Sequence, residues 1–232
     1  MVASYIETEA PFLGDWLQLR PGSSCNATVE LRCWLPLFCR AVSAHTLLDY
    51  GCGARGWFNG CDIRPTRYVG VDVDEDTISY NKTVYPAIEF HHLEGSGHDV
   101  PQADVVFCKD VFQHLPNDDV ISTLEAICET RARFLITSLD SYPPPPTNES
   151  RNFQSEVGVC DGNGYIPENL SIEPFLLTNL VGTVILDNKF YQVWDLDEEP
   201  IPHRVLYSIT PYDKVLLSNQ KVCAANVGIV NV

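Results

Sequence analysis

The chain has 232 residues, of which 45% are hydrophobic and 20% charged, a composition typical of a folded globular protein. No apolar run approaches the roughly 18 residues that a membrane-spanning helix needs, and the first residues do not resemble a signal peptide. A formal net charge of −16 repels phosphate backbones, which disfavours a nucleic-acid partner. The nine cysteines include no C-x-x-C pair, so they indicate neither a zinc site nor a disulfide framework and favour a reducing cytoplasm.

The first predicted elements are an irregular arm and a helix. Residues 1–25 contain proline and glycine breakers, and we expect them to form an N-terminal arm or lid. Apolar residues recur at helical spacing from Asn26 to His45, which predicts a helix with Asn26 as its N-cap. Pro36 lies inside this pattern and is expected to weaken or split it.

The next segment predicts two strands joined by a glycine turn. Its parts are an apolar strand at 46–49, glycines at 51, 53 and 56, and a second apolar strand at 68–71 followed by Asp72. The first two glycines permit a sharp turn and a close approach of the backbone to a ligand. An acid at the end of the second strand is placed to accept hydrogen bonds from two ribose hydroxyls. Together these features indicate a ligand that contains a nucleoside.

The remaining pattern alternates helices and strands and then changes. After the glycine segment we expect a helix at 74–85, strands at 88–95 and 103–110, a helix with Asn117 as its N-cap, and a strand at 133–140. A proline-rich loop and about thirty irregular residues then run to Leu177, and loops of that length are usually functional. Strands at 182–187 and 189–196, joined by a tight Asp-Asn turn, predict an antiparallel hairpin.

This order of elements predicts an α/β fold: a mostly parallel sheet with a C-terminal antiparallel hairpin and helices on both faces. We expect the α/β domain to occupy residues 26–197 and residues 198–232 to form a C-terminal extension whose structure the pattern does not reveal. Met1 is the only methionine, and the tail looks like a domain boundary, so the chain is expected to be part of a longer multidomain polypeptide.

The helix before the first strand and the D-x-G-x-G sequence at that strand's end resemble the Rossmann-like class I S-adenosylmethionine-dependent methyltransferases, over residues 26–197. The chain is also similar to a subgroup of this family found beside glycosyltransferases. That similarity rests on G-S-S at 22–24, V-E-L-R-C-W-L-P at 29–36, C-K-D-x-x-x-H-L at 108–115 and a P-x-N-L-x-x-x-P-F-like block at 167–175. The sequence departs from the commoner family pattern at Arg55, which stands where that pattern has its third glycine.

The resemblance implies S-adenosyl-L-methionine as the cofactor and assigns it a set of contacts. Those implied near the methionine part are Asp49, Gly51, Cys52 and Gly53, with Ser23, Ser24 and Arg32 closing over the carboxylate end. Those implied near the ribose and adenine are Asp72, Val73, Glu94 and Gly95, and those beside the sulfonium are Cys108 and Lys109.

Asp110 and His114 follow the fourth strand and are the predicted catalytic residues. One helical turn would separate them, so both could face the sulfonium, and either could remove a proton from an acceptor hydroxyl. A histidine is suited to this because it titrates near neutral pH. Packing and capping are the alternative roles, and a divalent metal shared with Asp140 is a further possibility, although no metal is predicted. The expected acceptor contacts are Asp140, Tyr142, Arg151 and Asn152.

The sequence therefore predicts an S-adenosylmethionine-dependent methyltransferase that modifies a hydroxyl of a sugar, a glycan or another small molecule, with no nucleic-acid or membrane partner. Two alternatives stay open. One is a methyltransferase-like binding module without catalysis, and the other is an NAD-dependent oxidoreductase. Asp49 directly before the turn argues against the second, because an acid there would repel a pyrophosphate. No Tyr-x-x-x-Lys pair is present either.

Overall fold

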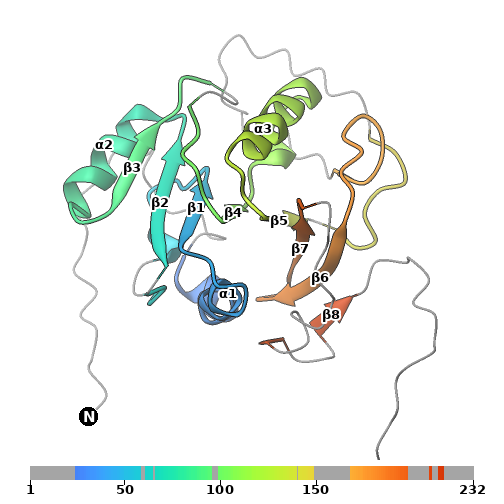
Figure 1. Cartoon of the computed structure of the whole chain (residues 1–232), viewed down its shortest axis with the longest axis horizontal. Helices are drawn as coiled ribbons and strands as arrows, with labels where there is room; N and C mark the ends of the chain where they lie inside the picture. The colour runs from blue at the N-terminus through green and yellow to red at the C-terminus, as the bar shows by residue number, and fades with distance from the viewer. Residues whose placement is uncertain are drawn as a thin grey trace, which may run out of the picture.

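The computed structural model describes residues 24–58, 61–64, 66–95, 99–139, 141–148, 168–197, 209–210 and 214–216. Its centre is an eight-stranded sheet with the order β3-β2-β1-β4-β5-β7-β6-β8 (Figure 1). β1 to β5 pair in parallel, whereas β7 pairs antiparallel with both β5 and β6. The predicted α/β fold with an antiparallel C-terminal hairpin is confirmed.

The elements lie close to the predicted ranges. The parallel strands are β1 (Thr46–Tyr50), β2 (Arg67–Asp72), β3 (Glu89–His92), β4 (Val105–Cys108) and β5 (Phe134–Leu139). The antiparallel strands are β6 (Leu180–Leu186), β7 (Lys189–Asp195) and β8 (Val215–Leu216). The helices are α1 (Val29–Ala41), α2 (Glu75–Val84) and α3 (Asn117–Glu129), with short 3-10 turns η3 (Asn26–Thr28), η4 (Gly56–Phe58) and η5 (Phe112–His114). β3 and β4 are shorter than predicted at both ends, and bends at 94–95 and at Asp110 follow them.

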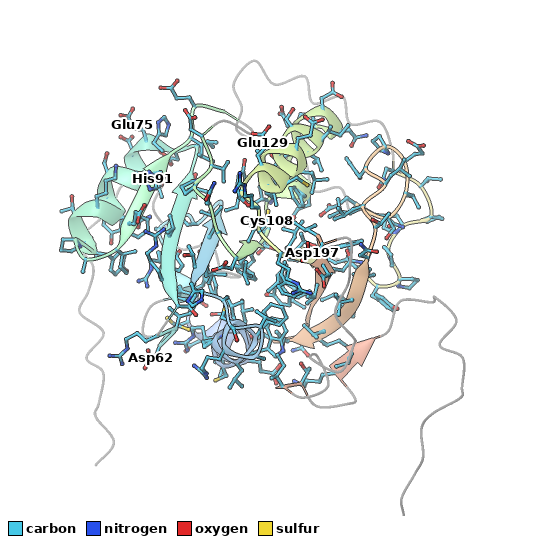
Figure 2. All side chains as sticks on the ribbon, viewed as in Figure 1. Asp62, Glu75, His91, Cys108, Glu129 and Asp197 are labelled. Carbon is cyan, nitrogen blue, oxygen red and sulfur yellow. The ribbon has the colours of Figure 1, made fainter. Side chains whose placement is uncertain are left out.

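Two hydrophobic clusters cover the two faces of the sheet. One contains Trp34 and Phe38 of α1 and Ile78 of α2, packed against side chains such as Leu47 and Phe107. The other contains Val120 and Ile127 of α3, packed against the neighbouring, oppositely directed side chains of the same strands. Figure 1 shows α1 and α3 on opposite sides of the sheet, and Figure 2 shows Cys108 near the middle of the molecule.

The start of α1 differs from the prediction. Asn26 begins the η3 turn, and the N-cap position is Thr28, whose side chain makes no capping hydrogen bond. Asp187, in the turn between β6 and β7, instead accepts hydrogen bonds from the backbone N–H groups of Glu30 (2.9 Å) and Leu31 (3.0 Å). The Glu30 carboxylate accepts one in return from the Asp187 N–H at 2.7 Å. This is the reciprocal geometry of a capping box, supplied from a distant turn, and the prediction of Asn26 as the N-cap is wrong.

Two further local predictions are wrong. α1 continues unbroken through Pro36. Proline has no N–H to give to the carbonyl of Arg32, and the Cys61 thiol donates to that carbonyl instead, at 3.2 Å. Asn117 is the first residue of α3, and the N-cap position is Pro116.

Part of the predicted C-terminal extension packs against the sheet and α1. β8 pairs antiparallel with β6, and the indole N–H of Trp34 donates to the hydroxyl of Thr210 at 2.7 Å. Lys214 forms an ion pair with Glu30 at the start of α1. In the described part of the chain, no helix combines the length and the apolar character needed to cross a bilayer.

Candidate cofactor and acceptor site

The turn after β1 contains Gly51 and Gly53, and its backbone lies at the carboxyl end of the parallel strands. Gly51 has φ +72°, and a Cβ there would lie 2.4 Å from a methyl group of Val111, so a larger residue would collide. Gly53 has φ +51° and open space where a Cβ would stand. The sequence expectation of a backbone that a ligand can approach closely is consistent with this geometry.

Asp72 holds this turn in place from the end of β2. Its carboxylate accepts hydrogen bonds from the N–H groups of Gly53 (2.8 Å) and Asp74 (3.0 Å). Burial raises the pKa of Asp72, and the two hydrogen bonds oppose that rise. On the other side of the turn, the side-chain amide of Asn81 in α2 donates to the carbonyl of Gly53 at 2.7 Å. The backbone of the glycine turn is therefore fixed by Asp72 from β2 and by Asn81 from α2. Val73, the residue after Asp72, is exposed.

Asp49, at the end of β1, is 1% exposed and only partly satisfied. One carboxylate oxygen accepts a hydrogen bond from the hydroxyl of Tyr68 at 2.6 Å, and the other has no hydrogen-bond partner among the described residues. Burial raises the pKa of Asp49 to about 7, against the lowering effects of the Tyr68 hydrogen bond and the charges of Arg55 and Lys109. A buried, half-satisfied carboxylate is costly for the fold and is typical of a ligand site.

The end of β4 contributes buried sulfur and a buried ammonium group. Cys108 pairs with Tyr50 of β1 in the sheet, and burial raises the pKa of its thiol well above the usual value. Lys109 follows it, and its ammonium group lies 2.5 Å from a carboxylate oxygen of Asp110. Cys52, in the glycine turn, is a second buried thiol, and burial raises its pKa as well.

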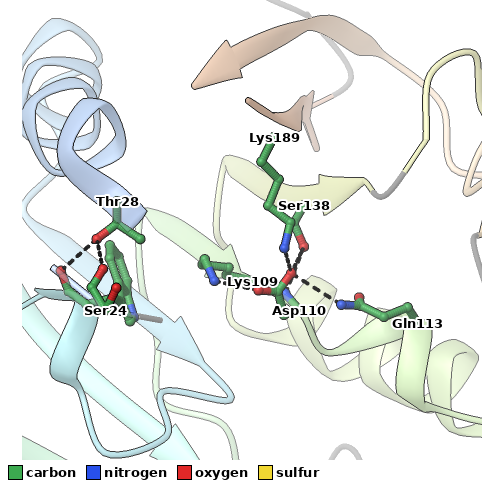
Figure 3. A network of polar contacts seen from close by, with 8 residues as sticks. Ser24, Thr28, Lys109, Asp110, Gln113, Ser138 and Lys189 are labelled. Carbon is green, nitrogen blue, oxygen red and sulfur yellow. Dashed lines mark hydrogen bonds and ion pairs between the residues drawn. The ribbon is translucent and has the colours of Figure 1, made fainter. Parts of the chain in front are cut away.

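Asp110 is the centre of a polar network that joins three elements (Figure 3). It has φ +59°, and its backbone N–H donates to the hydroxyl of Ser138 in β5 at 2.7 Å. Its carboxylate binds the ammonium groups of Lys109 and Lys189, the latter from β7. It also accepts hydrogen bonds from the side chains of Gln113 and Ser138, both at 3.2 Å. Burial alone would raise the pKa of Asp110, but the two lysines lower it to about 2.

His114 ends η5, and its side chain is half-buried. The turn between Asp110 and His114 is 3-10 helical from Phe112, so the expected helical spacing is present only in its second half. Sequence reasoning missed the other members of the network: Gln113, Ser138 and Lys189. Only Gln113 lies in the motif that drew attention to this segment, and neither of the other two stands in a recognisable pattern.

The residues expected around the rest of the cofactor lie at the edges of this region. Ser24 accepts a hydrogen bond from the N–H of Ala27 at 3.2 Å, and the guanidinium of Arg32 donates to the carbonyl of Cys25 at 3.1 Å. Glu94 and Gly95 are exposed after β3, where Gly95 has φ +105°. The predicted contacts Ser23, Asp140, Arg151 and Asn152 lie outside the described residues.

Tyr142 lies beyond the end of β5 and stacks on Phe190 of β7. The ring centroids are 5.6 Å apart with an interplanar angle of 28°, and Tyr142 is 36% exposed. The loop that carries Tyr142 is tied to the segment before β6 by Asn148. The side chain of Asn148 donates to the carbonyls of Asn169 (2.9 Å) and Glu173 (2.8 Å) and accepts from the Asn169 N–H at 2.8 Å.

Comparisons with known proteins found matches over part of the chain. Residues 48–132 match the sequence model of a family described as "Methyltransferase domain", a range that contains the glycine turn and the Asp110 segment. No curated protein sequence matches the chain.

Several solved structures overlap part of the fold. The methyltransferase domain of bacterial CtHen1-C is 18% identical with a TM-score of 0.44, covering 50% of this chain and 67% of that one. Magnesium protoporphyrin IX methyltransferase (ChlM) from Synechocystis PCC 6803 is 15% identical with a TM-score of 0.38, covering 51% and 64%. CalS10, an amino pentose methyltransferase from Micromonospora echinaspora, is 19% identical with a TM-score of 0.39, covering 46% and 48%. The chain thus spans less than two thirds of the last two structures.

The family match covers the β1 turn, the end of β2 and the end of β4. These segments contain the glycines of the turn and the acids Asp49, Asp72 and Asp110. Over residues 48–132 the chain is therefore similar to the methyltransferase-domain family.

Proposed function

We propose that this domain transfers the methyl group of S-adenosylmethionine to a hydroxyl of a carbohydrate or another small acceptor. The observation that carries the acceptor part is the Tyr142–Phe190 stack, a partly exposed aromatic surface at the start of β7, the strand that also supplies Lys189 to the Asp110 network. Small-molecule sites typically combine such an aromatic surface with a few fixed polar groups.

The residues on the cofactor side fit the group that they would hold. S-adenosylmethionine carries an ammonium group, a sulfonium and two ribose hydroxyls. The buried oxygen of Asp49 that has no hydrogen-bond partner within the described part of the chain suits the ammonium group, and the open space over Gly53 admits a ligand against the backbone. Asp72 has lone pairs left for ribose hydroxyls after accepting its two backbone hydrogen bonds.

When bound, the cofactor would supply a methyl group attached to a positively charged sulfur. An acceptor oxygen can attack this methyl group in line, with the sulfur as the leaving group. This chain must then hold the acceptor at the correct angle and remove its proton. Of the two predicted catalytic residues, His114 suits proton removal. A carboxylate whose pKa is about 2 and which two lysines already bind is a weak base, so Asp110 is better suited to fixing the loop that presents His114.

The remaining parts of the proposal follow from the sequence. The partner is a small molecule or sugar rather than nucleic acid, because the formal net charge is −16. The proposed location is the cytoplasm. We also propose that residues 26–197 form the catalytic unit, with an arm at 1–25 and an extension at 198–232, within a longer polypeptide.

The test is transfer of an isotope-labelled methyl group from S-adenosylmethionine to a panel of sugars, glycans and phenols. We expect label on a hydroxyl, reduced turnover in Tyr142→Ala and His114→Ala, and cofactor affinity close to wild type in both. Binding of S-adenosylhomocysteine without transfer to any acceptor would favour a non-catalytic binding module. Label on nitrogen or carbon would reject the hydroxyl acceptor while keeping the methyltransferase.

A further inference from the structure

Arg55 stands in the glycine turn at a position where its own backbone is unfavourable. It has φ +57°, in the left-handed region that side chains other than glycine seldom adopt. The commoner family pattern has a glycine at this position. An unfavourable backbone conformation persists only where the surrounding structure holds it in place. The contacts of the Arg55 side chain should therefore explain why this conformation is kept.

The Arg55 side chain is enclosed by three aromatic rings. Its guanidinium carbon lies 5.0 Å from the ring centroid of Phe58 and 4.8 Å from those of Tyr68 and Tyr85. Arg55 is 8% exposed, and its Nε atom has no hydrogen-bond partner among the described residues. Cation–π contacts strengthen when water is excluded, so this enclosure stabilises a buried positive charge.

Tyr68 connects this charge to Asp49. One face of its ring contacts the guanidinium, and its hydroxyl donates to the Asp49 carboxylate at 2.6 Å. The charge of Arg55 also acts on Asp49 directly and favours the ionised carboxylate. Arg55 therefore acts on Asp49 both through Tyr68 and through space.

We propose that Arg55 is a positioning residue for the cofactor, which acts with Tyr68 to keep Asp49 ionised and oriented so that its unpaired oxygen can receive the cofactor's ammonium group. This inference rests on Asp49 being a cofactor contact, as proposed above, and is independent of the acceptor.

Several other groups face Asp49 and contribute to its ionisation. Those that act on it or that it acts on are Lys109 and Cys108 from the β4 end, Cys52 from the turn, and Asp72 and Tyr68 from β2. Among these, Lys109 is the other cation, and its ammonium group is already paired with Asp110. Removing the charge of Arg55 should therefore weaken the ionised form of Asp49 without disturbing the Asp110 network.

The experiment is calorimetric titration of the full chain with S-adenosylhomocysteine at several pH values between about 5.5 and 8.5. Wild-type affinity should decrease as the pH falls through about 7, because protonation removes the Asp49 charge. In Arg55→Met the pKa of Asp49 should be higher, so the decrease should begin at a higher pH, and a displacement of one unit should lower the affinity about fivefold at pH 7.

Tyr68→Phe and Arg67→Met are the matched variants. Tyr68→Phe keeps the ring and removes only the hydroxyl, so it should displace the profile in the same direction, and it provides the test if Arg55→Met fails to fold. Arg67→Met removes a neighbouring, half-exposed charge paired with Glu89, and its profile should coincide with that of the wild type.

An affinity loss of equal size at every pH in both Arg55→Met and Tyr68→Phe, or no loss in either, would overturn the proposal, since a packing role would not displace a titration. Failure of the wild-type protein to bind S-adenosylhomocysteine at any pH is a different result. It would count against the proposed cofactor contacts themselves.

Discussion

Asp49 and Asp110 lie near the carboxyl ends of two neighbouring parallel strands, β1 and β4. The hydrogen-bond partners and charges around their carboxylates are nevertheless opposite in kind. Asp49 has one hydrogen-bond donor and one unpaired oxygen among the described residues, and burial raises its pKa to about 7. Asp110 has two ammonium groups and two side-chain donors around its carboxylate, and the lysines lower its pKa to about 2.

The difference separates two uses of a carboxylate that is buried, as Asp49 is, or partly buried, as Asp110 is. A carboxylate whose partners are all supplied by the protein holds neighbouring elements together, whereas one left short of partners keeps binding capacity for a ligand at a cost in stability. Here the first kind connects β4, β5 and β7, and the second kind marks the proposed cofactor side.

The largest expected effect is that of Asp110→Ala on stability. The substitution leaves the buried ammonium group of Lys109 without its carboxylate, and breaking a buried pair from one side costs about 3–5 kcal/mol. Urea unfolding near neutral pH measures it. Asp62→Ala, which breaks an exposed pair with Arg64, should leave the unfolding midpoint unchanged. A loss in Asp110→Ala no larger than in that control would contradict the anchoring role.

The pH dependence of stability should show the same contrast. Because the folded pKa of Asp110 is about 2 and the usual value is 3.8, its contribution is present above about pH 4 and is lost as the pH falls from 4 towards 2. The amount is about 2 kcal/mol. Unfolding free energies of the wild type and of Asp110→Asn, measured along this interval, should therefore converge. Parallel curves would show that the lysines do not bind the carboxylate in solution.

Asp49→Asn should change the pH dependence of the unfolding free energy in the opposite direction. Burial disfavours the ionised form, so the wild-type protein loses stability as the pH rises from about 4 to about 7, the interval between the unfolded and folded pKa values. The neutral variant avoids this loss, and we expect it to be more stable than the wild type by about 1–2 kcal/mol near pH 8. The gain should vanish near pH 4, and affinity for S-adenosylhomocysteine should fall. A destabilised variant near pH 8 would show that Asp49 is satisfied within the fold.

The smallest expected effect concerns the acceptor side. Asn148→Ala removes three hydrogen bonds to Asn169 and Glu173, which should cost about 1 kcal/mol globally because water can replace part of them. Hydrogen exchange should accelerate at the Asn169 amide while the amides of β4 and β5 stay protected. Equal acceleration in the strands would mean that this loop and the sheet unfold as one unit.

The proximity of the proposed cofactor contacts could be predicted from sequence because these residues are nearly contiguous. Asp49, Gly53 and Asp72 belong to one strand–turn–strand unit, and the parallel pairing of β1 with β2 brings their ends together. The partly unsatisfied state of Asp49 could not be predicted, since it depends on where the Tyr68 hydroxyl points.

The Asp110 network and the cap of α1 depend on contacts between distant segments. Lys189 reaches Asp110 only because β7 inserts between β5 and β6, and Asp187 reaches α1 only because the hairpin ends there. A search among neighbouring residues suggests Asn26 as the N-cap, but it cannot reveal Asp187, whose carboxylate comes from a distant part of the chain. In contrast, Asp74 caps α2 locally, through hydrogen bonds from the N–H groups of Asp76 and Thr77.

The tip of the β6–β7 hairpin has a practical consequence. Asp187 and Asn188 both have positive φ, as a tight two-residue turn requires, and such exposed tips are the usual places to open a chain or insert a tag. Here one side of the tip holds the first turn of α1 and the other side holds Asp110. A circular permutant with new termini at this turn would detach both at once, so new termini or fused domains belong elsewhere on the surface.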